Sequence, residues 1–326
     1  MGRLSHRLIA GIDRFQQRHA LLGFPLAVRQ KFAEDQGGFL AASVTYYAFF
    51  SIFPLLLVFV TLLGYALQGD PDLQRRVLDS AFADFPVIGP QLKSNVHSLH
   101  GSAVALAVGI GVAVWAGTGV ALALENALDH IWGVPIRRRA NPLLARLRAL
   151  VWIAVLGGVT LIGTVLGSAS AIANYATAAR AAALVISLAI NVVVFLAVFR
   201  VLTSHAPSWR DVLPGALVAA LAWESLQLAG GYIVNHQVRH ASSTYGVFAI
   251  VIGLLSWLYL AANVTLLSAE INVVLRRRLW PRSFSLITEQ PLTPGDEHAL
   301  RQRAQVEERR SDEDVDVAFE QPEKRV

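Results

Sequence analysis

The sequence predicts an all-α, polytopic membrane protein with six transmembrane helices and both termini in the cytoplasm. Of its 326 residues 54% are hydrophobic and only 16% are charged, whereas soluble domains have about 25% charged residues. Long windows hold no charge, and 23 of the 28 Lys and Arg residues fall in segments that six spans place on one side. Because cytoplasmic loops are enriched in Lys and Arg, that side is assigned to the cytoplasm.

The N-terminal residues 1–38 form a basic arm. Apolar residues such as Phe24 and Val28 are interspersed there with charged ones, including Lys31, a composition typical of a short amphipathic helix lying at the membrane surface. Gly37-Gly38 follow, and we expect the chain to bend there into the bilayer, because glycine tolerates backbone angles that other residues disfavour.

Residues 39–280 form the predicted membrane domain, since a span needs roughly 20 mostly apolar residues. The predicted spans are about 39–67, 102–124, 149–172, 181–202, 212–234 and 246–275, with an outer loop at 68–100. Pro54 predicts a bend in the first span, because it removes one helical hydrogen bond. Residues 281–326 are polar, and we expect a flexible charged cytoplasmic tail, with a short helix near 296–310.

Small residues recur every four positions along the second span. They are Ala105, Gly109, Ala113, Gly117 and Ala121. Such a face lets another helix approach closely. The partner is expected to be a second copy of the chain or another protein.

Polar side chains inside the spans are the main indication of function, since each is costly in hydrocarbon. In the predicted topology they gather in the cytoplasmic half of four spans, where we expect an inward-facing polar cavity. The set is Ser43, Tyr46, Tyr47, Ser51, Glu125, Asn126, Glu224, Gln227, Asn263, Glu270 and Asn272. The alternative is that these groups form interhelical hydrogen bonds that hold the bundle together.

The run Arg137, Arg138 and Arg139 lies in a predicted cytoplasmic loop. It is interpreted either as a determinant of topology or as a contact for anionic lipid head groups. The chain has no Cys, which excludes disulfides and thiol catalysis, and it has no phosphate-loop or H-E-x-x-H motif. We therefore predict no enzyme, no metal, no cofactor and no nucleic-acid partner.

Several motifs together resemble the YihY/BrkB family of bacterial inner-membrane proteins. They are Ala41-Ala42-Ser43-Val44-Thr45-Tyr46-Tyr47, Ser51-Ile52-Phe53-Pro54-Leu55, Ala127-Leu128-Asp129-His130-Ile131-Trp132-Gly133-Val134, Pro214-Gly215-Ala216-Leu217 with Trp223, Tyr245-Gly246, Trp257-Leu258-Tyr259, and Ala269-Glu270-Ile271-Asn272. The resemblance covers about residues 25–280. At Asp129 the family more often has Asn.

The resemblance implies six spans with both ends inside and an envelope role, and it suggests lipid handling. Some members were once labelled ribonuclease BN, a label that this sequence does not support. Our first hypothesis is a transporter or flippase-like handler of an anionic lipid or amphiphile. The second is a non-transporting scaffold for envelope proteins.

Overall fold

The computed structural model describes residues 20–66, 72, 103–139, 141, 143–152, 177–233, 246–283, 292–310 and 312–319. Throughout these residues the regular elements are helices, and no strand occurs among them. An all-α fold is therefore confirmed for the described part of the chain. The predicted outer loop 68–100, apart from Asp72, and the third predicted span beyond residue 152 lie outside it.

Five long helices coincide with predicted spans. They are α3 (Gly37–Ala66), α6 (Ala103–Ile131), α8 (Thr177–Val201), α9 (Trp209–Ile233) and α11 (Gly246–Arg277). Two described segments, Trp209–Gly230 and Val251–Arg277, are long and apolar enough to cross a bilayer, and Gly37–Ile52 and Val185–Val201 are shorter apolar stretches. Six crossings and the cytoplasmic termini stay predictions.

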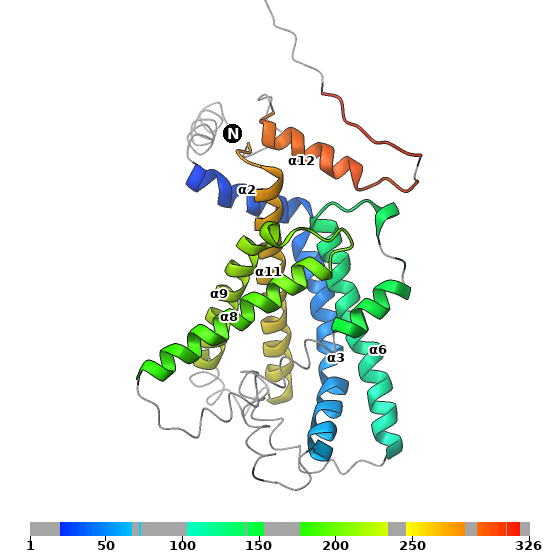
Figure 1. Cartoon of the computed structure of the whole chain (residues 1–326), viewed down its shortest axis with the longest axis vertical. Coiled ribbons are helices and arrows are strands. Elements are labelled where there is room, and N and C mark those ends of the chain that lie inside the picture. The colour runs from blue at the N-terminus through cyan, green and yellow to red at the C-terminus, as the bar shows by residue number, and fades with distance from the viewer. Residues whose placement is uncertain are drawn as a thin grey trace, which may run out of the picture.

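The long helices pack in the order α6, α3, α11, α9, α8, so that α11 is central (Figure 1). α11 also contacts α6 and α2 (Ala20–Glu34). Figure 1 shows α2 and α12 (Pro294–Gln305) lying across one end of the bundle, which we call the α2 end. The C-terminal ends of α6, α8 and α11 and the N-terminal ends of α3 and α9 meet there.

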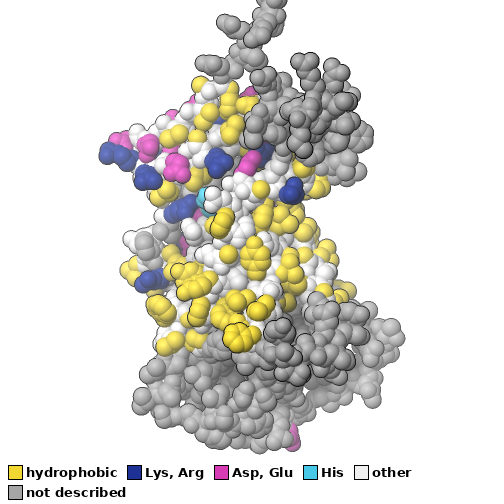
Figure 2. Space-filling model, turned by 180° about the vertical axis from the view of Figure 1, so that it is seen from behind, with side chains coloured by type: hydrophobic (Ala, Val, Ile, Leu, Met, Phe, Trp, Pro, Cys, Tyr) yellow, Lys and Arg dark blue, Asp and Glu magenta, His cyan; other side chains and the backbone are white. Residues whose placement is uncertain are grey.

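The long helices expose large apolar side chains on their outer surfaces. Figure 2 shows hydrophobic side chains over the middle of the molecule, with Lys, Arg, Asp and Glu gathered toward the α2 end. The exposed set includes Phe50, Trp115, Val193, Leu221 and Ile252. Apolar surface on this scale marks a membrane-facing or partner-facing region, and a hydrophobic surface with a charged end indicates a chain embedded in a bilayer.

The bend between α2 and α3 differs from the prediction. It falls at Asp35 and Gln36, and Gln36 has a φ of 54°. Gly37 is the first residue of α3, and a Cβ atom there would lie 2.3 Å from the ring of Phe32. The glycine is therefore required by the close approach of an aromatic ring, and Gln36 makes the turn.

α9 and α11 approach each other closely at Gly215. A Cβ atom on Gly215 would lie 2.1 Å from the carbonyl oxygen of Ser268. The N–H group of Gly215 donates a buried hydrogen bond of 2.6 Å to Oδ1 of Asn272. Pro214 precedes it within the first two turns of α9. Two of the motifs that carried the family resemblance therefore meet at one contact.

The C-terminal segment is folded where the structure describes it, which differs from the predicted flexible tail. Arg282, almost fully buried, donates to Glu34 of α2 at 2.7 and 2.9 Å and to Asp296 of α12 at 3.1 Å. Thr293 and Asp296 form a capping box that starts α12. Further along, Arg137 pairs with Glu308 at 2.6 Å. These charge-assisted contacts hold the segment against α2 and the end of α6.

Arg282, Glu34 and Asp296 together clamp the C-terminal segment onto α2, and we call this group the clamp. Opposing effects set the pKa values of Asp296 and Arg282. Burial raises the pKa of Asp296, but hydrogen bonds from Thr293, Ser283 and Arg282 outweigh it, so the pKa lies below its usual range. Burial lowers the pKa of Arg282, but its bonds to Glu34 and Asp296 raise it overall. The clamp is therefore formed by ionised groups.

Gly215→Ala tests the close contact of α9 with α11. The added methyl group meets a backbone carbonyl, so we expect a loss of about 1–3 kcal/mol of stability, as for other overpacked sites. Gly111→Ala is the matched control, because a Cβ atom there meets nothing within 4 Å. Thermal unfolding in detergent measures both variants. Equal melting temperatures for the two would contradict the assigned contact.

Asp296→Asn tests the clamp on α12. We expect tryptic cleavage within α12 to accelerate by roughly tenfold or more, since a charge-assisted hydrogen bond is worth about 1.5–3 kcal/mol. Because the pKa of Asp296 is lowered on folding, its stabilisation is present above the unfolded pKa and disappears as the pH falls through the folded value. Glu297→Gln is the control, because Glu297 makes an exposed pair with Arg301. Similar cleavage rates in both variants would refute the clamp.

Candidate functional site

The polar residues of α3 do not face a shared cavity. Ser43, Tyr46 and Tyr47 are exposed, and Ser51 donates to the Ala48 carbonyl of its own helix. The ring of Tyr47 lies against α6, because a Cβ atom on Gly119 would be 2.8 Å from it. Tyr47 therefore contributes to the packing of α3 on α6.

Glu224 of α9 is bound by α8. Its Oε1 accepts hydrogen bonds from Ser187 at 2.6 Å and from Asn191 at 2.8 Å. Nearby, Gln227 has a buried side-chain oxygen that no described group satisfies. On α11, Asn263 donates to the Tyr259 carbonyl one turn earlier. Glu224 thus joins two helices, as expected of an interhelical hydrogen bond.

Two other predicted residues, Glu270 and Asn272, lie at the α2 end of α11 and are fully buried. Glu270 is 3.5 Å from Nζ of Lys31 on α2. Asn272 binds Gly215, as described above. The predicted cavity residues that are described therefore occupy separate places on α3, between α8 and α9, and at the α2 end.

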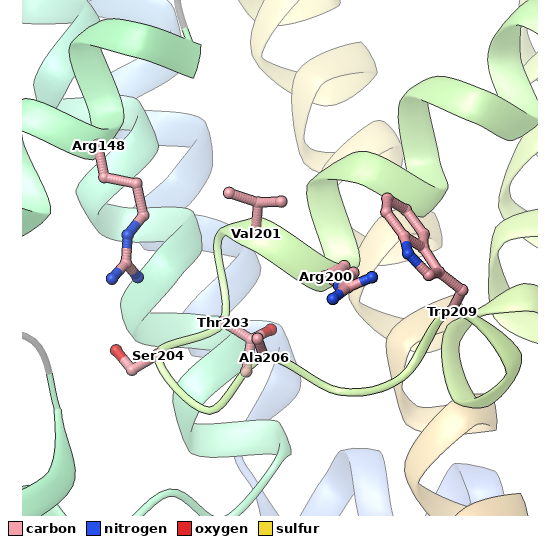
Figure 3. Close-up of a pocket in the computed structure, with 7 residues that line it drawn as sticks. All are labelled: Arg148, Arg200, Val201, Thr203, Ser204, Ala206 and Trp209. Atoms are coloured by element: carbon pink, nitrogen blue, oxygen red, sulfur yellow. The ribbon is translucent and has the colours of Figure 1, made fainter.

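A pocket of about 570 Å³ lies where α8 ends and α9 begins, and Figure 3 shows its lining. Arg148 and Ser204 lie on one side and Arg200 lies beside Trp209 on the other, with the turn from Thr203 to Ala206 between them. The guanidinium carbon of Arg200 is 4.3 Å from the ring centroid of Trp209. This cation–π contact orients one cation at the pocket.

Residues at the end of α6 bind the turn and the arginine that line this pocket. Both carboxylate oxygens of Asp129 accept from Ser204, one from its N–H and one from its hydroxyl, each at 2.7 Å. Glu125, one helical turn earlier, accepts from Arg148 at 3.2 Å. Asp129 is buried, so these hydrogen bonds fix the turn that follows α8.

The predicted anionic-lipid contact at Arg137–Arg139 is largely engaged within the chain. Arg137 pairs with Glu308 and donates to the Arg310 carbonyl. Arg139 donates to the side chain of Asn126 at 2.9 Å, which accounts for that predicted residue. Arg138 is exposed.

Sequence reasoning missed Arg148, Arg200 and Trp209 as a group. The two arginines enter only the count of Lys and Arg that assigns the cytoplasmic side. The available signal was the spacing of Arg200 and Trp209 around a short break between two apolar helices. Arg148 could be added only from the tertiary structure, because it lies on a separate helical segment, residues 143–152.

The helices, their apolar outer surface and the charged α2 end define a helical membrane protein with a basic pocket at one end of its bundle. Residues 28–286 match the family described as virulence factor BrkB. That match spans most of the chain, and the protein belongs to this family.

Named relatives agree with a bacterial membrane protein. The chain is 25% identical over 278 residues to the inner membrane protein YhjD of Escherichia coli (strain K12), covering 78% of this chain and 81% of that one. It is 30% identical over 172 residues to the UPF0761 membrane protein RSc1559 of Ralstonia nicotianae, covering 49% of this chain but only 38% of that protein. It is 24% identical to the ribonuclease-like protein YfkH of Bacillus subtilis (strain 168), covering 76% of this chain and 93% of that one. No solved structure matches.

Asp129→Asn and Asp129→Ala test how the pocket turn is held. In the Asn variant the amide oxygen still accepts from the Ser204 N–H and the amide group donates to the hydroxyl, so we expect little change. In the Ala variant both hydrogen bonds are lost, which costs about 1–3 kcal/mol at a buried site. Thermal unfolding of both variants provides the measurement. Equal destabilisation by Asn and by Ala would show that charge, and not hydrogen bonding, matters here.

Proposed function

We propose that this protein binds an anionic lipid or amphiphile at the pocket between Arg148 and Arg200 and handles it as a transporter or flippase-like protein. The observation that carries the proposal is two guanidinium groups at one pocket, beside Trp209, at the charged end of an apolar bundle. The predicted topology assigns this end to the cytoplasmic side of the inner membrane.

Arginine suits the head group for a geometric reason. Its planar guanidinium presents paired N–H donors that match two oxygens of a phosphate or carboxylate. Basic pockets between helices on the cytoplasmic side of a membrane are the expected sites for anionic head groups. Arg200 has Trp209 as its partner and makes no ion pair with any described carboxylate, so its donors remain available to an anion.

An apolar surface of α9 continues from the pocket. It consists of four side chains at four-residue spacing, each more than 40% exposed: Trp209, Leu213, Leu217 and Leu221. Residues four apart lie on one helix face. An acyl chain attached to a head group in the pocket can lie along this face, which favours an amphiphile over a free anion.

Movement across the membrane would require a polar group further along the same helices. Glu224 lies 15 residues after Trp209 on α9, about 22 Å at 1.5 Å per residue, and its partners Ser187 and Asn191 are on α8. The Ser187 hydroxyl and the Asn191 amide, which donate to Glu224, are donors that a head group can bind in its place. Glu224 and its partners are therefore assigned to movement of the lipid, and the pocket is assigned to its binding.

The scaffold alternative has less support. It is motivated by the small-residue faces of the second and third predicted spans and by the charged tail. On α6, Gly117 and Ala121 of that face are buried within this chain. Gly119 on the same helix is in contact with Tyr47 of α3. These residues serve packing within the chain. The proposal also treats the protein as a non-enzyme, in contrast to the ribonuclease-like name of one relative.

Arg200→Gln tests binding. We expect the affinity for phosphatidylglycerol to fall by about tenfold or more, because a charge-assisted hydrogen bond is worth roughly 1.5–3 kcal/mol. Arg148→Lys keeps the pair with Glu125 but loses the paired donors, so it should weaken binding less than Arg200→Gln. Native mass spectrometry with lipid titration measures both. Arg138→Gln is the matched control, an exposed arginine at the same end.

The pocket is refuted as the binding site if Arg200→Gln and Arg138→Gln bind the anionic lipid as the wild type does. A transport assay then tests the second part of the proposal. Purified protein in liposomes should move a labelled anionic lipid between leaflets, and Glu224→Gln should slow that movement while binding at the pocket persists. Binding without movement would support the lipid-binding part of the proposal and contradict the transporter part.

A further inference from the structure

A charged cluster is buried where α2, α6 and α11 meet, away from the pocket. Lys31 donates to Asp35, at the bend that follows α2, and to the Ile131 carbonyl of α6 at 3.1 Å. Glu270 of α11 lies 3.5 Å from the same ammonium nitrogen. The side chain of Glu270 is 0% exposed, Lys31 4% and Asp35 13%. Two carboxyl groups thus share one buried ammonium.

Glu270 has too few hydrogen-bond donors for an ionised carboxylate. Neither of its oxygens receives a hydrogen bond of ordinary geometry from a described residue. The Lys31 ammonium is directed instead at Asp35 and Ile131. A fully buried carboxylate without donors is strongly disfavoured, whereas its protonated form has an O–H that can itself donate.

Asp35 provides the acceptor for that proton. Its side chain accepts from the same Lys31 ammonium nitrogen that lies 3.5 Å from Glu270. One ammonium balances only one of two negative charges, so a proton bound by one carboxyl group removes the repulsion between the two. A protonated Glu270 would have an O–H to donate to Asp35, which already accepts from Lys31.

We propose that Asp35 and Glu270 form a proton-binding site that holds one hydrogen ion between their carboxyl groups and that this proton keeps α2 docked on α11. Loss of the proton places two adjacent negative charges beside a single ammonium in a buried site. The mutual repulsion and the cost of burial then favour separation of α2 from α11.

Other charged groups around the cluster have partners of their own. On α11, Arg277 donates to the Trp132 carbonyl and Arg276 pairs with Asp211 of α9 at 3.2 Å. On α6, His130 is the titratable side chain near Lys31 and Asp35, with Arg139 and Arg303 around it. Glu34 of α2 binds Arg282, and α3 contains no Asp, Glu, Lys, Arg or His.

Arg277 is the main rival explanation, because its charge acts on Asp35 and could balance an ionised pair. It does not replace the proton at Glu270, because its one assigned hydrogen bond goes to a carbonyl of α6. The two explanations can be distinguished by measurement. A shared proton requires a protonated carboxyl group at neutral pH. If Lys31 and Arg277 instead balance the charges of Asp35 and Glu270, both carboxyl groups are ionised.

Infrared spectroscopy of the purified full chain provides the first test. At neutral pH we expect a carboxylic-acid C=O band that shifts in heavy water and is lost in Glu270→Gln. In Asp35→Asn the band should persist at a shifted frequency, because its acceptor has changed. Asp211→Asn, which alters the more exposed pair at the same end of α11, should leave the band unchanged. Absence of the band, or its persistence in Glu270→Gln, overturns the proposal.

Hydrogen exchange of α2 amides tests the docking. In the wild type we expect protection of α2 to fall as the pH is raised, after correction for the intrinsic exchange rate. Glu270→Gln imitates the protonated group, so its α2 should stay protected at the higher pH, and Asp211→Asn should follow the wild type. Identical pH profiles for wild type and Glu270→Gln would refute the link. Neither measurement involves lipid, so these results are independent of the proposed function.

Discussion

The contact between Gly215 and the Ser268 carbonyl is the constraint on which the arrangement at the α2 end depends. It brings the backbones of α9 and α11 so close that no side chain fits between them. Asn272 then satisfies the Gly215 N–H, and Glu270 faces α2. Because α11 also contacts α3 and α6, a shift at this one contact would be transmitted to every helix around it.

The ion pairs at the α2 end determine where the C-terminal segment docks more than they add to the free energy of unfolding. Buried pairs recover little free energy after desolvation, yet removal of one partner is costly. Arg282 illustrates this, since it requires Glu34 from α2 and Asp296 from α12 at the same time. Arg137 and Glu308 place the end of the C-terminal segment in the same way. A shifted α12 would leave these charges buried without partners, so the docked position is favoured over its alternatives.

Helix positions could be predicted from the sequence, because long apolar runs depend on local composition. The sixth predicted span, 246–275, differs from α11 by two residues at one end. The partners of polar residues could not be predicted, since a helical period indicates which residues share a face but not which neighbour that face meets. Lys31 therefore looked like part of a surface-exposed arm, although it is buried against Glu270. The sequence predicts a short helix near 296–310, where α12 lies, but it does not predict the bonds of Arg282 and Asp296 that hold this segment in place.

The last turns of α6 connect the basic pocket with the buried cluster. Glu125 and Asp129 bind Arg148 and Ser204 at the pocket, while the carbonyls of Ile131 and Trp132 accept from Lys31 and Arg277. The residues that contact the two sites thus lie within one stretch, 125–132. A ligand that draws Arg148 away from Glu125 and a proton that holds α2 to α11 would act on the same stretch of helix. Coupling between sites requires an element that both can bias, and within the described residues the end of α6 meets the geometric part of that requirement.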